Sequence, residues 1–147
     1  MKPVFIILMF FSAITVSYAQ RIKEEQVPAI VKQALNQKYP GVTSKEWTKE
    51  KDVFEAEVIL NSKECEVAFN ANGEWLETER EIKVSELPAA VNNTIRTGEY
   101  KTWTIKEAEL IESPQYAKAY EVELKKNNEK VALLFSDDGN LIKTEKD

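Results

Sequence analysis

Pairs of glutamates, rather than a nucleophile with a base, are the residues whose spacing in this sequence could support chemistry. Glu55 and Glu57 lie two positions apart, and so do Glu64 and Glu66. In a β-strand, residues two apart point to the same face, and a short turn would make the two strands antiparallel neighbours. The four carboxylates are therefore predicted to lie close together, as a cation site or a docking patch for a basic partner. The alternative is a solvated strand face, where charged side chains contribute little.

The residue types needed for most hydrolytic and metal chemistry are missing. The chain contains no histidine, which removes the commonest general base, a principal zinc ligand and any Ser-His-Asp arrangement. Residues 137–140, Asp-Asp-Gly-Asn, lack the ligand spacing of a calcium loop and fit a tight turn instead. A glycosidase-like acid pair would need a cleft. We therefore expect no enzymatic activity, no cofactor and no metal site.

Large aromatic residues form the second group of binding candidates. They are Trp75, Trp47, Trp103, Tyr100 and Tyr116. Tryptophan is enriched at binding hot spots, but it is also an ordinary core residue. Trp75 alternates with Glu77 and Glu79, while Leu76 and Ile82 belong to the opposite set. If the Leu76 set faces inward, Trp75 stands exposed among carboxylates on the open face of the sheet. A slip of strand phase after the turn would reverse this assignment.

A unit that occurs twice carries most of these residues. Three stretches of the first half align with three of the second: 27–31 with 87–91, 54–58 with 120–124, and 69–79 with 135–145. The spacing between partners is constant across the strands and changes only between elements, as a change in loop length would produce. This pattern indicates a duplicated structural unit.

Each unit begins with a helix and continues with four strands. Apolar residues recur every three or four positions in 27–35 and 87–95, which is typical of a helix with one buried face. Alternation predicts strands at approximately 43–50, 53–60, 64–69 and 75–82, and at approximately 101–111, 117–126, 130–136 and 140–145. Turns of hairpin length make neighbouring strands antiparallel.

These elements predict an α+β fold of two tandem α-β-β-β-β repeats, with an antiparallel sheet and the helices packed on one face. The first repeat would comprise residues 20–84 and the second residues 85–147. Together they would form one compact domain, because four strands and one helix alone make a thin core. The sequence leaves open whether the two sheets merge.

Residues 1–19 have the pattern of a signal peptide. Lys2 precedes a short apolar run, and Ser17-Tyr18-Ala19 places small residues where signal peptidase reads, so we expect cleavage before Gln20. A retained membrane anchor is the alternative, but the apolar run is short for a span. We expect export, to the periplasm of a Gram-negative bacterium or by secretion, with no membrane insertion after cleavage.

The net charge of the chain limits the kinds of partner that it can bind. The formal net charge is −5, and the expected cleavage removes Lys2 but no acidic residue. An acidic chain without a basic block argues against binding to nucleic acid or anionic membranes.

Cys65 has no partner for an internal disulfide, and it alternates with Val67 and Phe69 as a buried strand residue would. We expect a monomer.

The arrangement of these segments resembles the PepSY-like, β-lactamase-inhibitor-protein-like family of exported bacterial proteins. Two pairs of segments carry the resemblance. Residues 27–31 and 87–91 share a Pro-Ala motif, and residues 69–79 and 135–145 share Phe, Gly and a final Thr-Glu. The resemblance covers nearly all of the mature chain. The resemblance implies a tandem α/β repeat and an exported binding or inhibitory module. The named inhibitor of that fold uses disulfides, so the resemblance assigns no target to this chain.

Two functions therefore stay open. The first is a non-catalytic periplasmic protein-interaction module that binds an envelope enzyme or peptidase through the open sheet face, and inhibits or regulates it. The second is a small-ligand or divalent-cation binding protein that uses Glu55, Glu57, Glu64 and Glu66.

Overall fold

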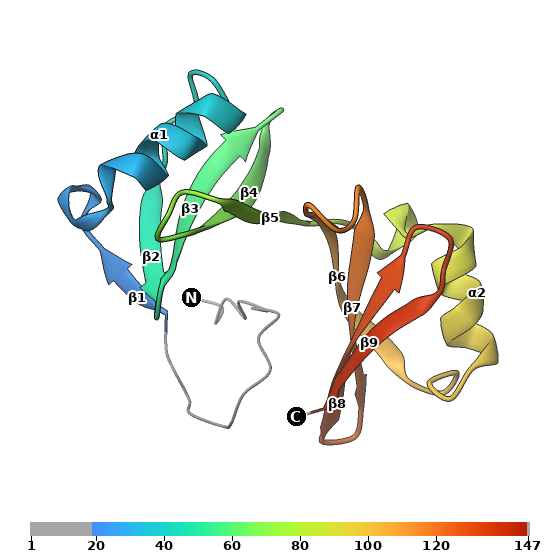
Figure 1. The fold of residues 1–147 in the computed structure, drawn as a ribbon. Helices are drawn as coiled ribbons and strands as arrows, with labels where there is room; N and C mark the ends of the chain where they lie inside the picture. Colours follow the sequence, from blue (N-terminus) through green and yellow to red (C-terminus); the bar gives the residue numbers. More distant parts are fainter. Residues whose placement is uncertain (1–18, 147) are drawn as a thin grey trace.

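The computed structural model describes residues 19–146, so the expected signal peptide lies outside the described residues except for Ala19. The chain forms one nine-stranded antiparallel sheet in which strand order follows chain order (Figure 1). The strands are β1 (Gln20–Ile22), β2 (Glu46–Glu50), β3 (Val53–Leu60), β4 (Lys63–Asn70), β5 (Trp75–Glu81), β6 (Thr104–Glu112), β7 (Ala119–Lys126), β8 (Glu129–Ser136) and β9 (Leu141–Lys146). The two repeats therefore share a continuous sheet, joined where β5 pairs with β6.

One helix accompanies each repeat. They are α1 (Ala29–Lys38) and α2 (Ala89–Thr97), and each follows a short 3₁₀ turn, η1 (Glu24–Gln26) or η2 (Val84–Glu86). Pro28 and Pro88 stand at the N-caps, where a missing backbone N–H leaves no hydrogen bond unmade. No helix within residues 19–146 is long and apolar enough to cross a membrane.

Two hydrophobic cores lie between the helices and one face of the sheet. In the first repeat, Val31 of α1 packs with Val58 and Val67 of the strands beneath it. In the second, Val91 of α2 occupies the equivalent place. Ile82, directly after β5, belongs to the second core, so this strand leads from one core into the other. The alternation seen in the sequence is thus explained by one covered and one open face of the sheet.

The predicted α+β fold of two repeats is confirmed. The predicted strand limits agree with the observed limits to within a few residues. Strand β1 was not predicted, because three residues without alternation carry no strand pattern; it is added by pairing with β2. Cys65 is buried in the first core as predicted, with 4% of its surface exposed.

The repeated Phe-to-Glu stretch forms a turn that approaches its helix closely. Gly73 and Gly139 have φ of +79° and +82°. A Cβ on Gly73 would lie 3.0 Å from the carbonyl oxygen of Ile30, and one on Gly139 would lie 2.6 Å from the carbonyl carbon of Ala90. Only glycine combines this backbone conformation with so short an approach. The duplicated stretch therefore fixes each helix on its sheet.

Candidate functional site: the acidic face of the sheet

The face of the sheet opposite the helices carries two glutamates from each strand from β3 to β7. Within a strand the two are separated by one buried residue that points to the helix-bearing face. We call eight of these ten carboxylates, all but Glu107 and Glu123, the acidic face: Glu55, Glu57, Glu64, Glu66, Glu77, Glu79, Glu109 and Glu121.

The register of the sheet brings these carboxylates side by side. Glu66 lies directly opposite Glu57 on one side and Glu79 on the other. In the second repeat, Glu109 of β6 lies directly opposite Glu121 of β7. Like charges directly opposite each other on neighbouring strands destabilise a sheet. The row is therefore unfavourable for the folded chain when its members are ionised.

Several carboxyls of the row have raised pKa values. Burial, followed by the charges of neighbouring glutamates, raises the pKa of Glu109 to about 7 and that of Glu121 to about 8. The pKa of Glu55 and that of Glu79 are raised further, again mainly by burial. These four carboxyls therefore take up protons far more readily than an exposed glutamate, whose pKa is near 4.3.

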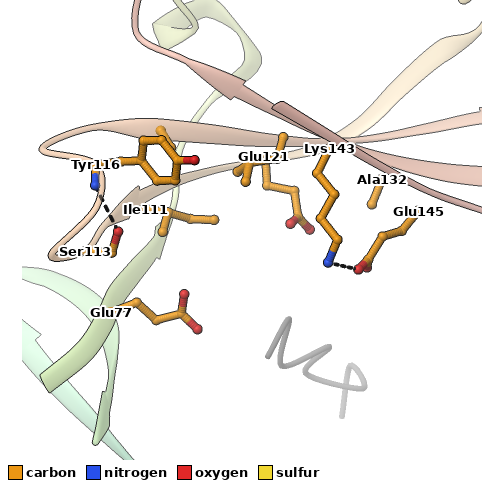
Figure 2. A pocket seen from close by; sticks show the side chains of 10 residues that line it. Glu77, Ile111, Ser113, Tyr116, Glu121, Ala132, Lys143 and Glu145 are labelled. Carbon is orange, nitrogen blue, oxygen red and sulfur yellow. Dashed lines mark hydrogen bonds and ion pairs between the residues drawn. The ribbon is translucent and has the colours of Figure 1, made fainter. Parts of the chain in front are cut away.

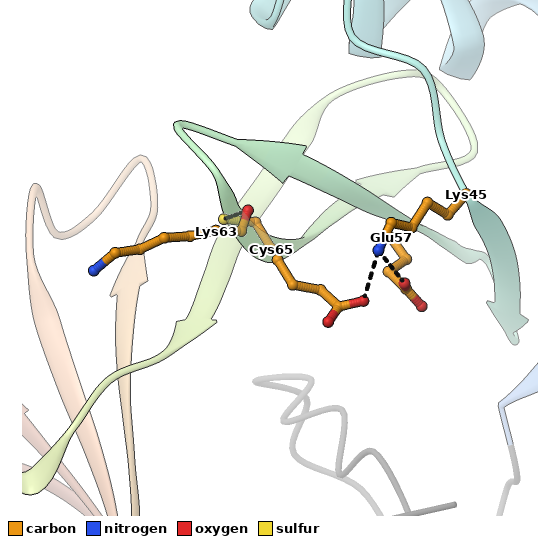
Figure 3. Close-up of polar contacts among 5 residues, drawn as sticks. Lys45, Glu57, Lys63 and Cys65 are labelled. Carbon is orange, nitrogen blue, oxygen red and sulfur yellow. Dashed lines mark hydrogen bonds and ion pairs between the residues drawn. The ribbon is translucent and has the colours of Figure 1, made fainter.

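Counter-charges reach only the margin of the row. Lys45 Nζ lies 3.2 Å from Glu64 Oε1 and 3.6 Å from Glu57 Oε1, and Figure 3 shows it facing Glu57. Lys143 forms an ion pair with Glu145 on β9. Among residues 19–146, no lysine or arginine forms an ion pair with the carboxylates at the centre of the row: Glu55, Glu66, Glu77, Glu79 and Glu109.

Glu79 is the most constrained member of the row. It is 9% exposed, and its Oε1 atom is buried without a hydrogen-bond partner among the described residues. A buried carboxyl oxygen without a partner is costly. The centre of the acidic face is therefore a place where an added donor or cation would be favourable.

A small pocket lies at one end of the row (Figure 2). Tyr116, from the loop between β6 and β7, and Ile111 form one side of it, and Glu77, Glu121 and Lys143 lie around it. Its volume of about 30 Å³ has room for one water molecule or the tip of a side chain, and not for an organic ligand. Tyr116 is the candidate aromatic residue that borders the acidic face.

The other candidate aromatics lie on the helix side of the sheet. Trp47 and Tyr100 are core residues, 3% and 7% exposed, so the expectation that they present a binding surface is corrected. Trp103 is half-buried and meets the ring of Tyr100 edge-on, with 5.3 Å between centroids. Packing against the cores explains these three positions.

Trp75 also lies on the helix face, which corrects its expected exposure among the carboxylates. The β4–β5 register shifts between Ala68 and Phe69, so Phe69 pairs with Trp75 whereas Ala68 pairs with Glu77. This bulge moves Trp75 to the side opposite Glu77. Its Nε1 donates to Thr78 Oγ1 at 3.0 Å, and Lys38 Nζ lies 3.2 Å from a ring centroid of Trp75.

The register brings the four glutamates of the predicted acidic site onto one face, next to four further carboxylates that were not predicted to belong to it: Glu77, Glu79, Glu109 and Glu121. The sequence does contain a pattern that indicates these further carboxylates, because the Glu-x-Glu spacing recurs in every strand from β3 to β7. It becomes meaningful only with the strand order, since β5 and β6 belong to different repeats.

The row does not form a metal site of the usual kind. Within residues 19–146, no group of three or more aspartate, glutamate, cysteine or histidine side chains is arranged to hold a metal ion. The carboxylates are spread along a row across five strands rather than gathered around a point. This geometry suits an extended cationic ligand better than a single ion.

The fold and this face define a tandem-repeat α+β scaffold with one covered and one open sheet face. The family described as "Putative beta-lactamase-inhibitor-like, PepSY-like" matches residues 14–61 and 55–143, and the chain belongs to this family. A search of curated proteins found no match.

Solved structures share the fold of this chain. A BLIP-like protein from Bacteroides fragilis NCTC 9343 is 28% identical with a TM-score of 0.71, covering 81% of this chain and 85% of its own. A structure from Bacteroides eggerthii DSM 20697, described as one of that species' "putative periplasmic proteins", is 23% identical with a TM-score of 0.71, covering 82% and 88%. None of these descriptions names a catalytic activity.

Proposed function

We propose that this protein is a non-catalytic interaction module of the bacterial cell envelope that binds a basic segment of a partner protein on its acidic face. By doing so it inhibits or regulates an envelope enzyme or peptidase. The observation that carries the proposal is the row of central carboxylates without a cation partner among the described residues.

A basic segment would supply what the row lacks. Lysine or arginine side chains favour the ionised form of nearby carboxylates and offset their mutual repulsion. Strands lie about 4.8 Å apart, so a row from β3 to β7 spans roughly 19 Å, the length of about six residues of extended chain. An extended segment with several basic residues therefore matches the row in length and in charge.

The proposed location in the envelope rests on two observations. The amino-terminal pattern predicts export. The similar structure from Bacteroides eggerthii is described as periplasmic. The second function left open by the sequence, binding of a divalent cation, receives no support from the arrangement of the described carboxylates.

Fluorescence anisotropy with a labelled lysine-rich peptide tests the proposal. We expect binding that weakens as salt is added, because exposed charges are screened. The triple variant Glu66→Gln, Glu77→Gln and Glu109→Gln should lose at least tenfold in affinity. Affinity of the wild type should rise with pH, because the peptide favours the ionised carboxylates.

A matched control separates the row from net charge. Glu24, Glu25 and Glu99 are exposed and lie outside the acidic face, so their triple change to glutamine removes the same number of carboxyl groups and alters the formal net charge equally. We expect this control to bind as the wild type does. Equal losses in both triple variants would show a nonspecific attraction and refute the proposal, as would the absence of binding at low salt.

A further inference from the structure

A cleft of about 520 Å³ lies on the opposite, helix-bearing face, between the two repeats. One wall is formed by Lys38 at the end of α1, by the segment that follows it to Val42, and by the β3–β4 turn. The other wall is formed by β5 and β6. This volume falls within the range of about 300–1,000 Å³ that is usual for small-molecule sites. The cleft shares no lining residue with the acidic face.

The charge of the cleft is the reverse of that of the acidic face. Three cations, Lys38, Lys63 and Arg80, line it together with one carboxylate, Glu112. Lys63 is partly neutralised, because its Nζ lies 3.5 Å from Glu86 Oε1. Partial burial lowers the pKa of Lys38, against the opposing effect of Glu112. The cleft therefore favours a ligand with a negative charge.

Arg80 is the strongest indication that the cleft binds an anionic ligand. Its Nη1 atom is enclosed and has no hydrogen-bond partner, and Arg80 forms no ion pair with any of residues 19–146. A guanidinium remains charged at any physiological pH, so enclosing it without an anion is unfavourable. Its planar donors match the two oxygens of a carboxylate, which they bind in pairs.

The remaining lining residues indicate what the anion is attached to. Pro40, Val42, Leu60 and Leu110 give the cleft an apolar part beside its cations. Inorganic ions would leave this surface uncovered. An organic acid with an apolar body would cover it and gain from removing it from water.

The wall of the cleft is held in place by its own contacts. The Thr78 hydroxyl lies 2.9 Å from Tyr39 OH and accepts a hydrogen bond of 3.0 Å from Trp75 Nε1. Lys38 Nζ lies over the Trp75 ring, an attractive cation–π contact. These contacts fix α1 to β5 at the cleft, and preorganisation of this kind lowers the entropic cost of binding.

We infer that the cleft between the repeats binds a small organic carboxylate with an apolar body, whose carboxylate pairs with Arg80 and whose body covers Leu60 and Leu110. This site is independent of the proposed function, because it lies on the other face and selects the opposite charge. Either can fail while the other holds.

Calorimetry with phenylacetate, 4-phenylbutyrate and octanoate tests the inference. At least one of these acids should bind and raise the melting temperature. The neutral amide of each acid and inorganic phosphate serve as probes that lack the charge or the apolar body, and we expect them to bind at least tenfold more weakly. Absence of binding by all three acids up to millimolar concentration would overturn the inference, as would equal binding of an acid and its amide.

Arg80→Gln should lower the affinity for the acid at least tenfold, and Arg80→Lys should lower it less, because lysine keeps the charge and loses the planar donors. Arg96→Gln is the matched control: Arg96 is exposed on α2, and we expect no change. Since Arg80 forms no ion pair within residues 19–146, Arg80→Gln should melt no lower than the wild type. If it nevertheless fails to fold, Arg80→Lys carries the test, and wild-type affinity in that variant would contradict the role of the guanidinium.

Discussion

At the scale of single residues, Glu109 and Glu121 couple folding to proton uptake. The pKa of Glu109 rises to about 7 and that of Glu121 to about 8, mainly through burial. In the unfolded chain both return to about 4.3. Between these values the folded protein holds more protons than the unfolded chain. The free energy of unfolding therefore falls as pH rises from about 5 to about 8.

Replacing both residues by glutamine removes their share of this dependence, while Glu55 and Glu79 keep theirs. We expect the double variant Glu109→Gln and Glu121→Gln to gain about 1–3 kcal/mol over the wild type at pH 8 and to differ little at pH 5. Thermal unfolding followed by circular dichroism at both pH values measures the effect. An equal decrease in melting temperature between the two pH values for wild type and variant would contradict the role of these carboxyls.

At the scale of elements, the close approach of each repeated turn to its helix explains why the same sequence motif occurs twice in the chain. Gly139 is the more tightly placed of the two glycines, since its absent Cβ would lie 2.6 Å from the backbone of Ala90. Thr94 Oγ1 also donates to the Gly139 carbonyl at 2.8 Å, which ties the turn to α2. In the first repeat the equivalent approach, to Ile30, is 3.0 Å.

Alanine substitutions rank these contacts. We expect Gly139→Ala to cost about 3 kcal/mol or more, and Gly73→Ala about 1–3 kcal/mol, because each adds a steric clash to backbone strain. Gly41 is the control: its φ is +78°, but nothing lies within 4 Å of its Cβ position. Gly41→Ala should therefore cost only about 1 kcal/mol. Urea unfolding measures all three, and equal costs would show that the helix contact contributes nothing.

How far the elements could be predicted depends on how local their cause is. Alternation revealed eight strands, because each of these buries one side of itself. The side of Trp75 depended on a bulge at Phe69, which strand phase alone does not show. Glu109 could be placed beside the first repeat's glutamates only through the β5–β6 pairing, which crosses the repeat boundary. Local patterns thus predicted the strands, and long-range pairing decided the site.

At the scale of the whole molecule, β5 makes the two repeats into one sheet with two chemically different faces. It pairs with β4 on one edge and β6 on the other. Thr78 contacts Tyr39 of the first repeat, whereas Ile82, just beyond the strand, is buried in the second core. Glu77 and Glu79 on the same strand extend the acidic face, and Arg80 between them and Ile82 points into the opposite cleft.

This shared strand predicts that the repeats unfold together. In a Trp103→Phe variant, fluorescence reports on Trp47 and Trp75 of the first repeat; in a Trp47→Phe and Trp75→Phe variant, it reports on Trp103 of the second. Within each variant we expect the fluorescence midpoint in urea to coincide with the midpoint from circular dichroism. Separate midpoints would show that the repeats are independent units joined only at the β5–β6 edge.

The central claim is that the acidic face binds a basic segment, and a residue-resolved map of the bound protein tests it most directly. Backbone amide shifts of the isotope-labelled protein would be followed while a lysine-rich peptide is added at low salt. We expect shifts concentrated on β3 to β7 around Glu66, Glu79 and Glu109, with α1 and α2 unchanged. Shifts confined to the helices, or spread evenly over exposed glutamates such as Glu25 and Glu99, would contradict it.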